Sequence, residues 1–294
     1  MNPRLRCLGA PAVIFLVMSA SGAAAQQGDS SKGQMLLRLD SLIADAAAIA
    51  VQVPTTAQMV TTALRAQPGS SSGSVSAWGA SWGDVFFGGG YQSRARYTRA
   101  HDGSLSAGFG LGSPTRDLGL EVVLNSASTF RQGVGTNGSV SLKIHRVLPG
   151  AYGVAVGFEN AANWGGTDGG ASVYGVVSHT VQMRENANDF FGSLAWNAGV
   201  GNSRYLPERD LLAGKKGVNA FGSVGLRIHE RASLIGDWTG QDLAAGLSLV
   251  PFRRSPLVVS VGLADLTHTA GDGARLVIGA GMGLKVSDLL GRNH

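Results

Sequence analysis

The chain has 294 residues and a formal net charge of +5, and 15% of its residues are charged, against about 25% in an average soluble domain. The cations are scattered and form no basic run or stripe, which argues against a nucleic-acid interface. The single cysteine, Cys7, excludes a disulfide framework and a cysteine-based metal site.

The first 25 residues have the pattern of a secretory signal peptide. Arg4 and Arg6 give a short basic start, residues 10–20 are an apolar run, and the alanines at 23–25 fit the small-residue cleavage pattern. The apolar run is shorter than the roughly 20 residues that a membrane-spanning helix needs. We therefore expect residues 1–25 to direct export and to be removed.

Residues 26–77 are expected to form an N-terminal segment that precedes the main domain. Apolar residues recur at helical spacing over 35–53, and Pro54 ends that pattern. Residues 67–77 are rich in serine and glycine, which is typical of a flexible linker. This N-terminal segment is a candidate plug for the main domain that follows it.

From residue 84 onwards apolar and polar residues alternate with a period of two. Glycine, serine and alanine dominate the second face, and charges are few. The pattern predicts twelve strands of about the length that a tilted membrane strand needs, which is ~9–11 residues. The predicted strands are 84–92, 104–111, 118–124, 139–145, 152–159, 172–182, 190–200, 218–229, 232–238, 243–249, 257–264 and 275–286.

The connections between these strands alternate in length. Counted from the first strand, the odd connections are mostly long and the even ones mostly tight, apart from a short odd connection at 239–241. Long loops at one end and short turns at the other are typical of outer-membrane barrels. The fold class predicted for residues 78–294 is therefore all-β, a twelve-stranded antiparallel transmembrane β-barrel preceded by a short N-terminal helical segment.

Aromatic residues on the apolar face suggest two girdles. Those expected outward near the long loops are Tyr91, Phe158, Trp196 and Trp238, and those expected near the turns are Tyr152 and Phe190. A secreted β-sandwich also alternates, but its outer face would carry charges, and here the polar face carries few.

The chain resembles bacterial outer-membrane β-barrel proteins, porin-like and of no specific subfamily, over residues 83–286. The leader, the alternation and the ending Gly279-Ala-Gly-Met-Gly-Leu-Lys-Val286 carry this resemblance. The ending departs from the usual pattern because its last residue is not aromatic. The resemblance implies location in the outer membrane, contact with outer-membrane lipid and insertion by the barrel assembly machinery.

Polar residues on the second face are the candidate lumen-lining set. Such side chains either set the selectivity of a pore or only satisfy each other inside a plugged barrel. Glu121 and Lys143 face inward at mid-height on neighbouring strands, where an ion pair is expected. The whole set is Asp84, Gln92, Glu121, Lys143, Glu159, Arg227, Asp237, Arg275 and Lys285.

Inward glycines are expected to form a wall with few side chains once the last strand closes on the first. They are Gly88, Gly90, Gly108, Gly110, Gly279, Gly281 and Gly283. Clustered glycine often marks close approach of another backbone. One hypothesis is that helix 35–53 docks on this wall and plugs the lumen; the other is that the glycines only ease strand curvature.

The leading function is a passive channel for small hydrophilic solutes, gated by the N-terminal segment. The alternative is a non-conducting barrel that anchors a periplasmic or envelope partner. No nucleophile–base constellation or metal-ligand spacing is evident, so no enzyme activity, metal or cofactor is expected. The sequence predicts no oligomeric state.

Overall fold

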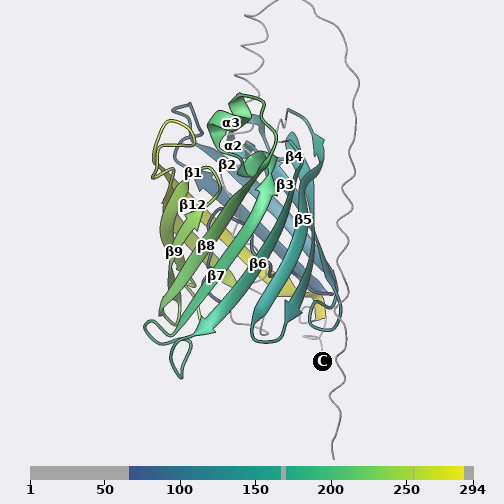
Figure 1. Cartoon of the computed structure of the whole chain (residues 1–294), viewed down its shortest axis with the longest axis vertical. Coiled ribbons are helices and arrows are strands. Elements are labelled where there is room, and N and C mark those ends of the chain that lie inside the picture. The colour runs from purple at the N-terminus through teal and green to yellow at the C-terminus, as the bar shows by residue number, and fades with distance from the viewer. Residues whose placement is uncertain (1–65, 167–169, 254, 288–294) are drawn as a thin grey trace, which may run out of the picture.

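The computed structural model describes residues 66–287, apart from 167–169 and 254. Within this range twelve antiparallel strands close into a barrel, in which each strand pairs with its neighbours in sequence and β12 pairs with β1 (Figure 1). The strands are β1 (Asp84–Gln92), β2 (Asp102–Gly112), β3 (Gly119–Ala127), β4 (Asn137–Leu148), β5 (Tyr152–Trp164), β6 (Ser172–Gln182), β7 (Ser193–Asn202), β8 (Val218–His229), β9 (Ala232–Trp238), β10 (Leu243–Leu249), β11 (Leu257–Ala264) and β12 (Arg275–Lys285). The predicted all-β barrel of twelve strands is confirmed.

The barrel closes because each strand keeps its register with two partners. Asp84 opposes Lys285 and Gln92 opposes Val277 where β1 meets β12, so no strand edge is left unpaired along this seam. The ladder is irregular at Val140/Leu142 between β4 and β5 and again between β8 and β9.

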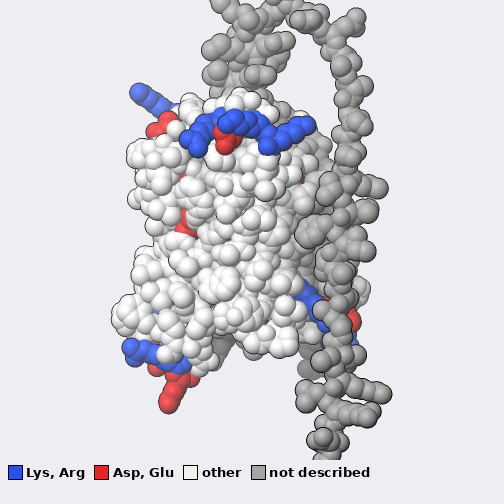
Figure 2. All heavy atoms as spheres, viewed as in Figure 1, with Lys and Arg blue, Asp and Glu red and all other residues white. Residues whose placement is uncertain are grey.

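The wall has an apolar outside and a mostly polar inside. Alternation sends one set of side chains outward, where large apolar residues stay exposed, among them Phe87, Leu124, Ile144, Val156, Val200, Val224 and Leu234. Inward positions carry buried polar residues such as Asp84, Glu121, Asn197 and Asp237. On the face shown in Figure 2 the charged side chains gather at the two ends and the middle of the wall is almost uncharged.

The two ends of the barrel differ in their connections. Residues 93–101, 128–136, 165–171, 203–217, 239–242 and 265–274 join strands at what we call the loop end. These connections contain the short helices α2 (Thr129–Gln132), η2 (Ser203–Tyr205) and α3 (Glu208–Leu212), and α2 and α3 lie together at the top of Figure 1. Residues 113–118, 149–151, 183–192, 230–231 and 250–256 form the opposite end, the turn end. No helix in the described part of the chain is long and apolar enough to span a membrane.

The β6–β7 connection is longer than predicted, and two aromatic residues therefore lie elsewhere than the sequence suggests. Phe190 lies in this connection and not on a strand, because β7 starts only at Ser193. Trp196 is then the fourth residue of β7 and packs beside His179, whose ring stacks on Tyr152 with 3.8 Å between centroids. Trp196 therefore belongs to the turn end, and the prediction that it lies near the long loops is wrong.

Candidate functional site: a lumen occupied by the chain

The lumen of the barrel holds residues 66–82 of the same chain, which we call the lumen loop. It starts at the turn end, where Ala66 packs against Val250 and Val258. It also ends there, where the N–H of Trp82 donates to the carbonyl of β2 Gly112 at 2.8 Å. Between these points it enters the barrel and returns, so the described part of the N-terminal segment is re-entrant.

The lumen loop covers residues 67–77, for which the sequence predicts a flexible linker. Most of these residues are buried, with Ser74 2% and Ala77 1% exposed. Serine and glycine suit this place because short side chains leave the backbone N–H and C=O groups free to bond to the wall. The predicted helix 35–53 and its docking lie outside the described residues.

A single carboxylate binds the tip of the lumen loop. Asp237, on β9, is fully buried. It accepts hydrogen bonds from the backbone N–H groups of Ser72, Gly73 and Ser74 at 2.7, 2.9 and 3.1 Å and from the Ser71 hydroxyl at 2.8 Å. Three consecutive N–H groups around one anion form a nest, and these charge-assisted bonds offset the cost of burying the carboxylate.

An ion pair also binds the tip of the lumen loop. Arg204 of η2 donates to Glu159 at 2.9 Å and to the carbonyl of Gly73 at 3.2 Å, and the Tyr205 hydroxyl donates to Glu159 at 2.8 Å. Burial and the Glu159 carboxylate raise the pKa of Tyr205 well above its usual value. Burial acts to lower the pKa of Arg204, but Glu159 outweighs it and the pKa is raised. Both groups therefore keep their protons at neutral pH.

Hydroxyl and amide groups of the wall hold the two arms of the lumen loop. The N–H of Ala77 donates to the Ser178 hydroxyl at 2.7 Å, and Ser178 in turn donates to Asn197. Asn197 also donates to the Ser70 hydroxyl at 3.3 Å, which links both arms to one pair of strands, β6 and β7. These groups are uncharged, so the wall needs no counter-ion here.

The expected ion pair between Glu121 and Lys143 is present at 2.9 Å and binds the lumen loop. Glu121 accepts the N–H of Ala80 at 2.8 Å, and Lys143 donates to the carbonyl of Trp78 at 2.7 Å. The His145 ring contacts the carbonyl of Ala80 at 3.1 Å. Both charges are almost fully buried, so each needs its partner and the loop backbone to balance its lost hydration.

Two inward glycines make room for the lumen loop. A Cβ on Gly110 would lie 2.3 Å from the backbone of Ala80, and one on Gly225 would lie 2.5 Å from the Cα of Ser70. These distances are shorter than any real contact, so the wall is shaped to the loop. Gly110 thus lies against residues 80–81, which follow the predicted N-terminal segment and are not part of helix 35–53.

The other predicted wall glycines divide into two groups. Gly88 opposes Gly281 and Gly90 opposes Gly279 where β1 meets β12, so closure brings these together as expected. Gly108 instead lies under the ring of Phe86, which would be 2.2 Å from its Cβ. The structure does not test whether any of these glycines docks a helix.

The remaining predicted lumen residues lie toward the two ends. Asp84 and Lys285 form an ion pair of 3.1 Å at the turn end, where half-buried Arg227 donates to the carbonyl of Glu230. Gln92 and Arg275 are buried near the loop end.

A buried polar cluster, which we call the loop-end cap, ties the connections together above the lumen. Arg96 donates to Gln241 at 2.8 Å and lies 3.9 Å from both Glu208 and Asp242. Arg275 lies 3.8 Å from Asp242. These residues come from four different connections or strands, so the cluster covers the lumen at the loop end as the lumen loop fills it from the turn end.

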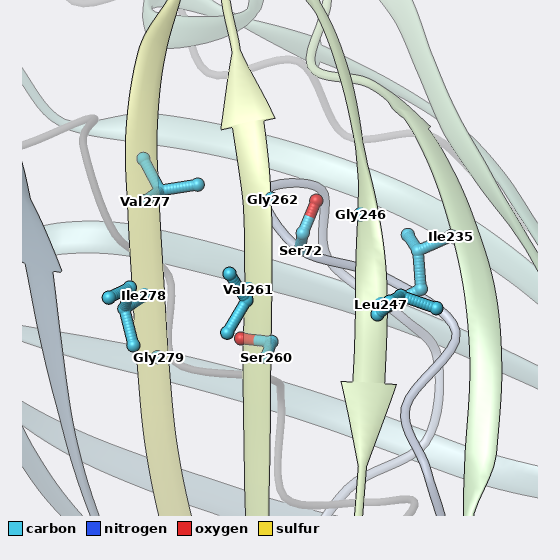
Figure 3. Close-up of a pocket in the computed structure, with 10 residues that line it drawn as sticks. All are labelled: Ser72, Ile235, Gly246, Leu247, Ser260, Val261, Gly262, Val277, Ile278 and Gly279. Carbon is cyan, nitrogen blue, oxygen red and sulfur yellow. The ribbon is translucent and has the colours of Figure 1, made fainter.

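A small pocket lies between the tip of the lumen loop and the wall. It is bounded by Ser72 and the inner faces of β9–β12 and has room for little more than water (Figure 3). In Figure 3 the segment that carries Ser72 passes behind β10 and β11.

Sequence reasoning missed the residues that hold the lumen loop from both sides. Alternation placed Asn197 and His145 on the lumen face without singling them out. Ser178 lies on β6, where the alternation is blurred. Arg96 and Arg204 lie in long connections, where nothing in the sequence separates a buried arginine from a solvated one.

Comparisons with known proteins add little to this geometry. No family model matches the chain, and no curated protein matches it. The structure is similar to that of the outer membrane protein Omp33 of Acinetobacter baumannii, at 8% identity, with 68% of this chain and 97% of that chain covered and a TM-score of 0.37.

Proposed function

We propose that this protein spans the bacterial outer membrane and is a passive channel for small hydrophilic solutes, closed at rest by its lumen loop. The observation that carries this proposal is the set of polar contacts that hold the loop, beside the apolar packing of Val75 in the aromatic cluster of the lumen. The loop's contacts with Asp237, Glu121, Lys143 and Ser178 are all hydrogen bonds to hydrophilic wall groups. Water can replace such bonds when the loop leaves.

The outward surface supports the membrane location. Large apolar residues remain exposed around the wall, among them Phe87 at 54% and Val156 at 61%. Contiguous apolar surface of this kind is costly in water and suited to lipid. The long connections at one end, the short ones at the other and the expected signal peptide fit an outer-membrane barrel with its turn end in the periplasm.

A second candidate function is a non-conducting barrel that anchors a partner. The aromatic cluster inside the lumen favours it. Tyr205 stacks on Phe221 at 4.3 Å, and Tyr174 packs edge-on against both rings. Apolar packing of this kind excludes water and rigidifies the interior. The loop-end cap closes the same region.

A reversible crosslink at the loop tip separates the two functions. A Cβ on Gly73 would lie 3.0 Å from Cγ2 of Thr239, so Gly73→Cys with Thr239→Cys places two sulfurs within disulfide reach. The chain beyond residue 25 has no native cysteine. Planar-bilayer conductance of the refolded 26–294 chain is recorded before and after reduction.

We expect voltage-dependent openings in the reduced protein and silence in the oxidised one. Openings of equal frequency in both states would show that the lumen loop is not the gate. Silence in both, from protein shown to be folded and inserted, would discard the channel and leave the anchoring function.

A further inference from the structure

We propose that the exposed cations of the loop end bind the phosphate groups of anionic lipid in the outer leaflet. This inference rests on the proposed membrane location. It also rests on the charge distribution at the loop end, where acidic side chains are buried or paired and basic side chains are exposed.

Acidic residues of the loop end are turned inward or neutralised. Asp102, Asp242 and Asp265 are at most 2% exposed. Asp272 is paired with Arg94, and Asp210 with Lys215 at 2.9 Å. Among the described residues, the acidic groups of this end therefore offer little negative charge to the outside.

Basic residues of the same end are turned outward. Arg99, Arg131, Arg209, Lys215 and Lys216 are all exposed, and the Arg209 and Lys215 side chains are 86% and 65% accessible. Figure 2 shows a row of Lys and Arg side chains along the upper rim, directly above the uncharged wall. The outer rim is thus cationic where the interior of the same end is rich in carboxylates.

The turn end shows no such sorting. Its exposed cations alternate with exposed acids, and Glu230 is bonded to Arg253 at 3.1 Å. That hydrogen bond and the Arg253 charge lower the pKa of Glu230, so the pair stays ionised. The excess of positive charge is therefore a property of the loop end, the end that would face the outer leaflet.

Apolar side chains beside these cations identify the occupant as lipid. Leu212 follows Arg209 in α3, and Val218, the first residue of β8, is 73% exposed just after Lys216. Phe130, 61% exposed, adjoins Arg131 in α2. At the top of an apolar wall, a cation can bind the phosphate of a lipid headgroup while the exposed apolar group beside it contacts the acyl chains. A free anion would need only the cations.

The test compares the folded 26–294 chain with two charge variants in bicelles. One variant carries Arg99→Gln, Arg131→Gln and Lys216→Gln; the matched control carries Arg184→Gln, Arg231→Gln and Arg253→Gln at the turn end. The probe is phosphatidic acid titrated into phosphatidylcholine bicelles, with a rise in unfolding temperature as the readout, because a ligand of the folded state stabilises it. Inorganic phosphate without phosphatidic acid is a separate arm.

We expect the apparent affinity for phosphatidic acid to fall roughly fivefold for each loop-end cation removed, and to change little in the control. An equal loss in both variants, no loss in either, or full stabilisation by inorganic phosphate alone would overturn the assignment. A barrel that fails to enter neutral bicelles would instead contradict the proposed membrane location.

Discussion

At the residue scale, the tip of the lumen loop is held by one carboxylate whose main partners are backbone groups. Asp237 has no cation within ion-pair distance among the described residues and depends on the N–H groups of residues 72–74. Such a site holds a peptide loop firmly while the loop is present. It also leaves an unbalanced charge in the lumen when the loop departs, which favours hydration over collapse.

We predict that Asp237→Asn loosens the tip of the lumen loop. The loss of charge-assisted bonds removes about 2 kcal/mol, so local opening should increase roughly 30-fold. Hydrogen exchange of the amides of residues 72–74 measures this, with Asp189→Asn in an exposed turn as the control. Unchanged exchange at these amides would mean that Asp237 does not hold the loop.

Substitutions of Glu121 and Lys143, the buried ion pair, should have strongly non-additive effects on the free energy of unfolding. Glu121→Gln leaves the Lys143 charge buried with only a carbonyl and should lower the free energy of unfolding by about 3 kcal/mol. Adding Lys143→Met removes that charge, so the double variant should be more stable than Glu121→Gln alone. Urea unfolding in detergent measures both. A double variant that loses the sum of two large single losses would contradict the coupling.

At the scale of elements, the lumen loop and the wall are shaped to each other. Gly225 of β8 lies against the Cα of Ser70, whereas Gly175 of β6 would have nothing within 4 Å of an added Cβ. Contact with the lumen loop therefore requires a glycine at position 225 and does not require one at position 175.

We predict that Gly225→Ala displaces the lumen loop and that Gly175→Ala does not. The probe is Ser76→Cys, a mild change because the Ser76 hydroxyl is buried and has no hydrogen-bond partner within residues 66–287 as described. Maleimide labelling of this cysteine should become several-fold faster with Gly225→Ala, since the added methyl cannot fit. Equal labelling rates in the two alanine variants would show that the loop yields without leaving its place.

At the scale of the whole molecule, the surface is an apolar wall between two charged ends. Val224 lies midway along β8 and is 48% exposed, and Val218 lies at the start of the same strand. If the wall faces lipid, the cost of a charge must depend on its depth. Val224→Lys should lower the stability of the inserted barrel by about 2–4 kcal/mol and Val218→Lys by at most about 1 kcal/mol.

Unfolding of the two variants in lipid vesicles tests this dependence on depth. A comparable loss at both positions, or no loss at either, would contradict a bilayer around the middle of the wall.

The sequence by itself determined the barrel and, except in the strand at 172–182, the face on which most strand residues lie. Alternation with period two is a local property, and apolar residues such as Val140, Leu142 and Ile144 sort to one face whatever the rest of the chain does. The same alternation placed Glu121 and Lys143 together on the inner face of adjacent strands. The strand ends shifted by a few residues because long connections carry no periodic signal.

Only the tertiary structure decided what fills the lumen. Residues 67–77 have the composition of a linker, because serine and glycine have no strong preference of their own. Their place is set by partners more than 100 residues away, Asp237, Ser178 and Ser248, whose carboxylate and hydroxyl groups bond to the loop. Hydrogen bonds of that kind appear only when barrel closure brings β6, β9 and β10 around one space, and no local pattern records them.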